Sequence, residues 1–129
     1  MKRIKILLMD DSAPFARVTM EFLAENERLD VIGVACSCEE ALERIRSDVP
    51  DLVLMDVNMP GGMSGIDLTA QIRASSDFPK IVVISLHDNQ EYRVGALVAG
   101  ADAFLAKQDF STDLMPLIER LSASPPVGL

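Results

Sequence analysis

Residues 52–56 read Leu-Val-Leu-Met-Asp, four apolar residues in a row that end at a carboxylate. Residues 81–84, Ile-Val-Val-Ile, form a second short run in which every residue is β-branched. Runs this short that are apolar at every position predict strands buried on both faces, as in the centre of a parallel sheet. The two runs therefore favour a domain in which helices cover both faces of such a sheet.

Strand-like and helix-like segments alternate outward from these two runs. Further strands are predicted over residues 4–9, 31–35 and 103–105. The segments between strands carry apolar residues at helical spacing, and the first helix is expected to bury Phe15, Val18, Thr19, Phe22 and Leu23. Five strands alternating with five helices predict right-handed crossovers and a doubly wound α/β domain with a five-stranded parallel sheet.

Cap signals mark where several of these helices begin and end. Ser37, Ser64 and Asp88 each precede a helical segment and have an acidic residue three positions later. Gly100 is a predicted left-handed helix end. Repetition of these signals supports the helices predicted from periodicity.

The composition is that of one soluble globular domain. The chain has 129 residues, 49% hydrophobic and 25% charged, with a formal net charge of −8. The acidic balance argues against direct binding of nucleic acid. No apolar run approaches the roughly 20 residues that span a bilayer, so no membrane association and a cytoplasmic location are expected. We predict a domain over residues 1–122 and a Ser- and Pro-containing tail or linker over 123–129.

The two cysteines, Cys36 and Cys38, are expected on an extended segment after the second strand. Their spacing makes a disulfide between them geometrically unfavourable. We expect both to be small residues without a special role.

Polar residues stand where the predicted strands end. Asp10 and Asp11 follow the first strand, Asp56 ends the third, Ser85 ends the fourth, and Lys107 lies just beyond the fifth. The carboxyl ends of strands in a doubly wound sheet line one crevice, where ligands bind. Crowded carboxylates repel each other, and a hard divalent cation such as Mg²⁺ relieves that conflict. With a lysine and a hydroxyl beside it, one carboxylate is suited to carry a phosphoryl group.

These residues resemble the receiver domains of two-component response regulators. The resemblance rests on Asp10-Asp11, on Asp56 followed by Met59-Pro60, on Ser85, and on Lys107 after Phe104, and it covers about Ile4 to Leu121. It implies the flavodoxin-like receiver fold, with strand order 2-1-3-4-5.

The resemblance also implies roles for individual residues. Asp56 would accept a phosphoryl group from a sensor histidine kinase or a phosphotransfer protein. Mg²⁺ would be ligated by Asp11, Asp56 and the Asn58 backbone carbonyl, with Asp10 acting through water. Lys107 would pair with the acyl phosphate. Ser85 would then move toward the phosphate and Phe104 would turn inward, which biases a surface made by the fourth helix, fifth strand and fifth helix. A C-terminal effector domain beyond this chain and dimerisation on phosphorylation are further implications.

Several positions depart from the family pattern or are expected to modulate it. Gln108 follows the lysine where proline is common in the family. The conformation of the loop after the fifth strand is therefore not predicted. Leu86 replaces a small residue and is expected to narrow access to the site. In the family, the positions of Asn58 and His87 can influence the lifetime of the acyl phosphate, and we hypothesise that His87 does so here, although most lone histidines in such loops are merely exposed. Gly61-Gly62 adds one residue to the loop after Met59-Pro60.

Two other functions compete with the phosphorylated switch. One is an unphosphorylated pseudo-receiver that serves as a protein-docking module. The other is a phosphohydrolase on the same scaffold, although the loops are short for a substrate site. The chain has no Gly-x-x-x-x-Gly-Lys or Gly-x-Gly-x-x-Gly motif, so nucleotide binding is not predicted. We expect the chain to catalyse only its own phosphorylation and dephosphorylation.

Overall fold

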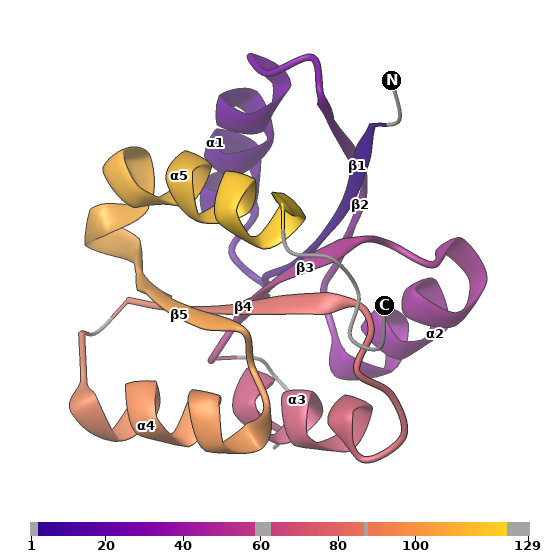
Figure 1. Ribbon diagram of the computed structural model, residues 1–129, viewed down its shortest axis with the longest axis vertical. Coiled ribbons are helices and arrows are strands. Elements are labelled where there is room, and N and C mark those ends of the chain that lie inside the picture. Colours follow the sequence, from indigo (N-terminus) through magenta and orange to yellow (C-terminus); the bar gives the residue numbers. More distant parts are fainter. Residues whose placement is uncertain (1–2, 59–62, 87, 124–129) are drawn as a thin grey trace.

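The computed structural model describes residues 3–58, 63–86 and 88–123. These residues alternate strand and helix along the whole described chain (Figure 1). The strands are β1 Ile4–Met9, β2 Leu29–Ala35, β3 Leu52–Asp56, β4 Lys80–Ser85 and β5 Ala103–Ala106. The helices are α1 Ala13–Ala24, α2 Cys38–Asp48, α3 Gly65–Arg73, α4 Gln90–Ala99, the 3₁₀ helix η1 Lys107–Asp109, and α5 Phe110–Ala123.

The five strands form one sheet in the order β2-β1-β3-β4-β5, and every neighbouring pair is parallel. All five residues of β3 are buried, as are the last five of β4. This burial on both faces is the reason why the two apolar runs lack a polar side. The predicted doubly wound fold and the strand order are confirmed.

Helices cover the two faces of the sheet unequally. Figure 1 shows α1 and α5 on one side of the strands, and α2, α3 and α4 on the other. Alternate strand residues divide between two cores accordingly. The first core includes Leu8, Leu54, Val82, Leu23 of α1 and Leu114 of α5. The second includes Met9, Met55, Val83, Leu68 of α3 and Ala96 of α4.

The buried face of α1 differs from the predicted one at Val18. Ala16, Thr19 and Leu23 are the buried residues of this helix, whereas the side chain of Val18 is 55% exposed. Val18 is two residues from Ala16, about 200° around a helix of 3.6 residues per turn, and therefore faces away from the sheet. The prediction that Val18 belongs to the core was wrong.

The predicted caps of α2 and α3 are present. The Ser37 hydroxyl accepts a hydrogen bond from the Glu40 amide at 3.1 Å. Ser64 and Asp67 form a reciprocal capping box at the start of α3. At the end of α4, Gly100 adopts a left-handed conformation with φ of 107°.

The predicted cap of α4 is one residue off. The side chain of Asn89, not Asp88, accepts from the Glu91 and Tyr92 amides. Asp88 instead pairs with Arg93, one turn into the helix, at 3.0 Å. Both side chains satisfy cap chemistry, so the sequence pattern did not distinguish them.

The cysteines are free, as predicted, but not on an extended segment. Cys36 is exposed after β2, and Cys38 is the first residue of α2. The helix begins there because Ser37 caps it, which removes the extended geometry that the sequence favoured.

Beyond β5 the chain turns directly into η1, and the Lys107–Gln108 peptide bond is trans. A Gln after the lysine is thus accommodated by a 3₁₀ turn. Helix α5 extends to Ala123. The predicted tail otherwise lies outside the described residues, and the boundary at residue 122 stays a prediction.

Candidate functional site

Four neighbouring strands bring the predicted site residues to one edge of the sheet. Asp10 follows β1, Asp56 ends β3, Ser85 ends β4, and Lys107 opens η1 directly after β5. Because β1, β3, β4 and β5 are adjacent in the sheet, residues far apart in sequence meet at the carboxyl ends. This is where a doubly wound sheet binds its ligands.

The Asp56 carboxylate is held at both oxygens. Its side chain is buried, with 4% of the residue exposed. Oδ1 accepts a hydrogen bond from the Asn58 amide at 3.0 Å, and Oδ2 accepts from the Lys107 ammonium at 3.1 Å. Each carboxylate oxygen keeps a further lone pair, so Asp56 is both fixed in position and able to act as a nucleophile.

The start of α3 packs closely behind this carboxylate. The Gly65 amide donates to the Val57 carbonyl at 2.9 Å. A Cβ at position 65 would lie 2.1 Å from the Asp56 carbonyl oxygen. Only glycine allows this approach, which fixes the backbone on which the acceptor side chain stands.

Asp10 shares the site with Asp56 and Lys107. Its Oδ1 accepts from the Ser12 amide at 2.8 Å, and its Oδ2 lies 3.6 Å from the lysine nitrogen. Burial raises the pKa of the Asp10 carboxyl to about 6, and the charge of Asp56 adds to that rise. The Ser12 amide and Lys107 lower the pKa, but burial dominates.

Three carboxylates converge, and the donor set fits a hard cation. One oxygen each of Asp10, Asp11 and Asp56 lies within 4.8 Å of the others, and Asp11 is exposed to solvent. A single ammonium cannot neutralise three carboxylates. Oxygen donors beside open solvent suit Mg²⁺, which retains several of its waters.

Lys107 lies against an aromatic ring as well as the carboxylates. Its ammonium is 4.2 Å from the centroid of the Phe15 ring on α1. Only 13% of the lysine side chain is exposed. The sequence placed Phe15 in the hydrophobic face of α1 and gave no sign of this contact.

Ser85 and Phe104 lie on adjacent strands beside the site. Ser85 is fully buried and pairs in register with Ala106, one residue before Lys107. Phe104 is 7% exposed and belongs to the core under α3 and α4. The guanidinium of Arg93 on α4 lies 4.8 Å above the Phe104 ring. Phe104 thus lies on the strand next to that of Ser85 and contacts α4 through Arg93.

A family model of the response regulator receiver domain matches residues 6–119. The chain belongs to this family. The receiver fold and its strand-end carboxylates agree with that assignment.

Similar proteins include both curated relatives and solved structures. The chain is 42% identical over 106 residues to a protein-glutamate methylesterase/protein-glutamine glutaminase of Idiomarina loihiensis, a match covering 81% of this chain and 27% of that protein. The receiver domain of the response regulator NarL from Mycobacterium tuberculosis has a TM-score of 0.85 and 28% identity, with 96% of this chain and all of that chain covered. The response regulator domain of Thermotoga maritima CheB has the same fold, with a TM-score of 0.83, 24% identity and the same coverage.

This receiver chain thus spans only about a quarter of the length of that methylesterase relative. Within the ranges that the structure describes, no helix is long and apolar enough to cross a bilayer.

Two of the remaining predicted residues, Leu86 and Asn58, are exposed beside the site. Leu86 is 63% exposed directly after β4. Asn58 is exposed, and its amide donates to Asp56. His87, Met59-Pro60 and Gly61-Gly62 lie outside the described residues. The effects predicted for Leu86, Asn58 and His87 on access or phosphate lifetime stay predictions.

Proposed function

We propose that this receiver domain is a phosphorylation-dependent switch that accepts a phosphoryl group on Asp56 from a sensor histidine kinase or a phosphotransfer protein. The observation that carries the proposal is the buried Asp56 carboxylate, held by Lys107 and Asn58 next to Asp10 and Asp11. Family membership adds to it.

Asp56, Asp11, Asp10 and the backbone carbonyl of Asn58 would hold Mg²⁺. When bound, the cation supplies positive charge that neutralises phosphoryl oxygens. The protein's own residues contribute by positioning the Asp56 carboxylate. The Asn58 amide and the Lys107 ammonium hold the two oxygens of Asp56 in fixed directions, so that one of them faces the incoming phosphorus.

In the transfer, an Asp56 oxygen forms a bond to phosphorus while the phosphorus–nitrogen bond of the phosphohistidine breaks. The bonding electron pair returns to the imidazole nitrogen. Lys107 is within reach of the developing negative charge because it already contacts Asp56 Oδ2. One equivalent is transferred per molecule, and only loss of the acyl phosphate resets the switch.

Phosphorylation would change the structure first at Ser85, then at Phe104 and finally at α4. Ser85 would bond the new phosphoryl group, and Phe104 would change its packing beneath Arg93. Helix α4 exposes Val94, Leu97 and Val98, the last of which is 82% exposed. These apolar side chains support dimerisation, or binding of an effector domain, through this helix.

Dimerisation is tested by light scattering with and without beryllofluoride, a mimic of the aspartyl phosphate. A Val98→Asp variant should lose any dimer that beryllofluoride induces. Val18→Asp, on the exposed side of α1, is the matched control and should behave like the wild type.

The switch itself is tested by an amide NMR titration with Mg²⁺ and then beryllofluoride, on the wild type and on Asp56→Asn. We expect Mg²⁺ to shift the amides around Asp11 and Asp56. Beryllofluoride should then extend the changes to Ser85 and Phe104 in the wild type only. If neither ligand binds, the chain is a docking pseudo-receiver instead.

A further inference from the structure

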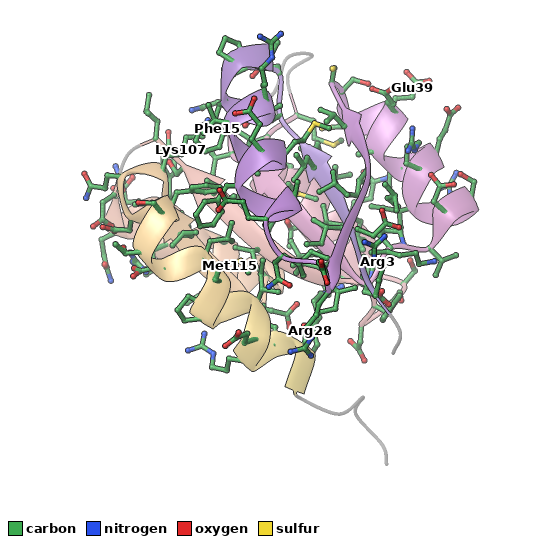
Figure 2. The ribbon with its side chains drawn as sticks, turned by 90° about the horizontal axis from the view of Figure 1, so that it is seen from above. Arg3, Phe15, Arg28, Glu39, Lys107 and Met115 are labelled. Carbon is green, nitrogen blue, oxygen red and sulfur yellow. The ribbon has the colours of Figure 1, made fainter. Side chains whose placement is uncertain are left out.

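We propose that Phe15 is a positioning residue for the site lysine: its ring holds the Lys107 ammonium beside the acceptor carboxylate. The inference rests on the proposed function, because the lysine matters through the phosphoryl group on Asp56. Figure 2 shows the two labelled side chains close together near the paired helices α1 and α5.

Lysine alone is a poorly positioned cation. It has a compact charge at the end of a flexible four-carbon stem, and such a side chain loses considerable rotamer freedom when it is fixed. Here the ammonium has three neighbours: Asp56 Oδ2 at 3.1 Å, Asp10 Oδ2 at 3.6 Å and the Phe15 centroid at 4.2 Å. The ring is thus the one uncharged surface among these three neighbours.

The ring attracts the ammonium electrostatically, and the attraction grows as the cation loses water. With 13% of its side chain exposed, Lys107 is largely desolvated. A cation–π contact changes the equilibrium constant for the contact by a factor of roughly 2 at exposed sites and up to roughly 30 at desolvated ones. This contact therefore contributes enough to restrict where the lysine points.

Phe15 is itself fixed by a second aromatic ring. It meets Phe110 edge-on, with centroids 5.5 Å apart and an interplanar angle of 68°. Phe110 is 6% exposed and opens α5, directly after the 3₁₀ helix that Lys107 begins. One short turn thus carries both the lysine and the ring that supports Phe15, so α1, η1 and α5 position the ammonium together.

The chain offers a matched control for this role. Phe22 also packs on Phe110, with centroids 5.1 Å apart, and no contact between Phe22 and Lys107 is among those of the described residues. Phe22→Leu weakens the same aromatic cluster and leaves the lysine contact in place. Phe15→Leu removes the ring that faces Lys107 but keeps an apolar side chain. Phe15→Tyr keeps the ring.

The first readout is the chemical shift of the Lys107 ε-protons in the unphosphorylated protein. A ring at this distance shifts them upfield in the wild type, in Phe22→Leu and in Phe15→Tyr, and the shift disappears in Phe15→Leu. Ordinary ε-proton shifts in the wild type overturn the proposal at this step, whether or not Asp56 is phosphorylated.

The second readout is labelling of Asp56 by acetyl phosphate and the affinity for beryllofluoride, both at saturating Mg²⁺. We expect Phe15→Leu to lower both about three- to tenfold, Phe22→Leu to change them less than about twofold, and Phe15→Tyr to restore them. Equal effects of Phe15→Leu and Phe22→Leu, with normal labelling of the wild type, overturn the role of Phe15 alone. A wild type that takes neither label nor beryllofluoride overturns the proposed function and this role with it.

Discussion

Replacing Asp10 by asparagine should stabilise the metal-free protein while weakening its site. Asp10 is buried beside Asp56, and burial raises its pKa from 3.8 to about 6. An amide at this position still offers an oxygen to the Ser12 amide, the bond that Asp10 Oδ1 makes now. The variant therefore removes a buried charge without removing the hydrogen bond that orients the side chain.

The magnitude follows from linkage between protonation and folding. A carboxyl whose pKa is higher in the folded state favours folding in its neutral form, so its ionisation opposes folding as the pH rises. The pKa difference is about two pH units, each worth about 1.4 kcal/mol. Ionised Asp10 therefore costs the metal-free fold about 3 kcal/mol above pH 6. This cost vanishes below the unfolded-state pKa of 3.8.

The assay is urea unfolding of the wild type and Asp10→Asn in EDTA at pH 7.5 and pH 5. The variant should be more stable by about 3 kcal/mol at pH 7.5 and by roughly half as much at pH 5. Mg²⁺ at about 1,000 times its Kd should reverse the order, because a ligand at that concentration adds about 4.1 kcal/mol to the protein that binds it. A variant no more stable than the wild type at pH 7.5, or a difference unaffected by pH, would refute the electrostatic cost assigned to Asp10.

Three further changes test other parts of the structure. Gly65→Ala should lower the free energy of unfolding in urea by about 2–3 kcal/mol, because the new Cβ would clash with the Asp56 backbone carbonyl, which cannot easily move. An unchanged urea midpoint would contradict this. Arg73→Met should lower the free energy of unfolding by about 2–3 kcal/mol, because Arg73 donates hydrogen bonds to the Gly100 carbonyl and to the Asp102 carboxylate, both at 2.9 Å. A variant as stable as the wild type would show that neither hydrogen bond contributes. Leu86→Ala should speed labelling by acetyl phosphate about twofold or more if Leu86 restricts access, and an equal rate would count against it.

The sequence predicted the features of the sheet that depend on short-range pattern. Residues 52–55 and 81–84 are apolar at every position because both faces of the sheet are covered there. Parallel topology then places the residues after each strand at one edge. The convergence of Asp10, Asp56 and Lys107 follows from that geometry, and the distances confirm it.

The sequence could not predict details that depend on how helices rotate and pack. Val18 has the right spacing for the buried face of α1, but the orientation of the helix on the sheet exposes it. Asp88 and Asn89 are both competent caps, and the pairing of Asp88 with Arg93 decides between them. The Phe15–Lys107 contact joins residues 92 positions apart, so no local pattern encodes it.

The same burial that fixes the Asp56 carboxylate makes the crowding of charge around it costly without a cation. Lys107 contacts two carboxylates, and although it lowers the pKa of Asp10, burial still raises that pKa to about 6. Lys107 and a divalent cation together would supply three positive charges against the three carboxylates, so the cation would balance the site before phosphorylation. A phosphoryl group on Asp56 would turn one carboxylate charge into about two phosphate charges, a net addition of about one negative charge at this edge of the sheet. On this argument the metal-free site is the less stable arrangement, and the negative charge that the proposed phosphorylation of Asp56 adds is what would favour repacking of Ser85, Phe104 and α4.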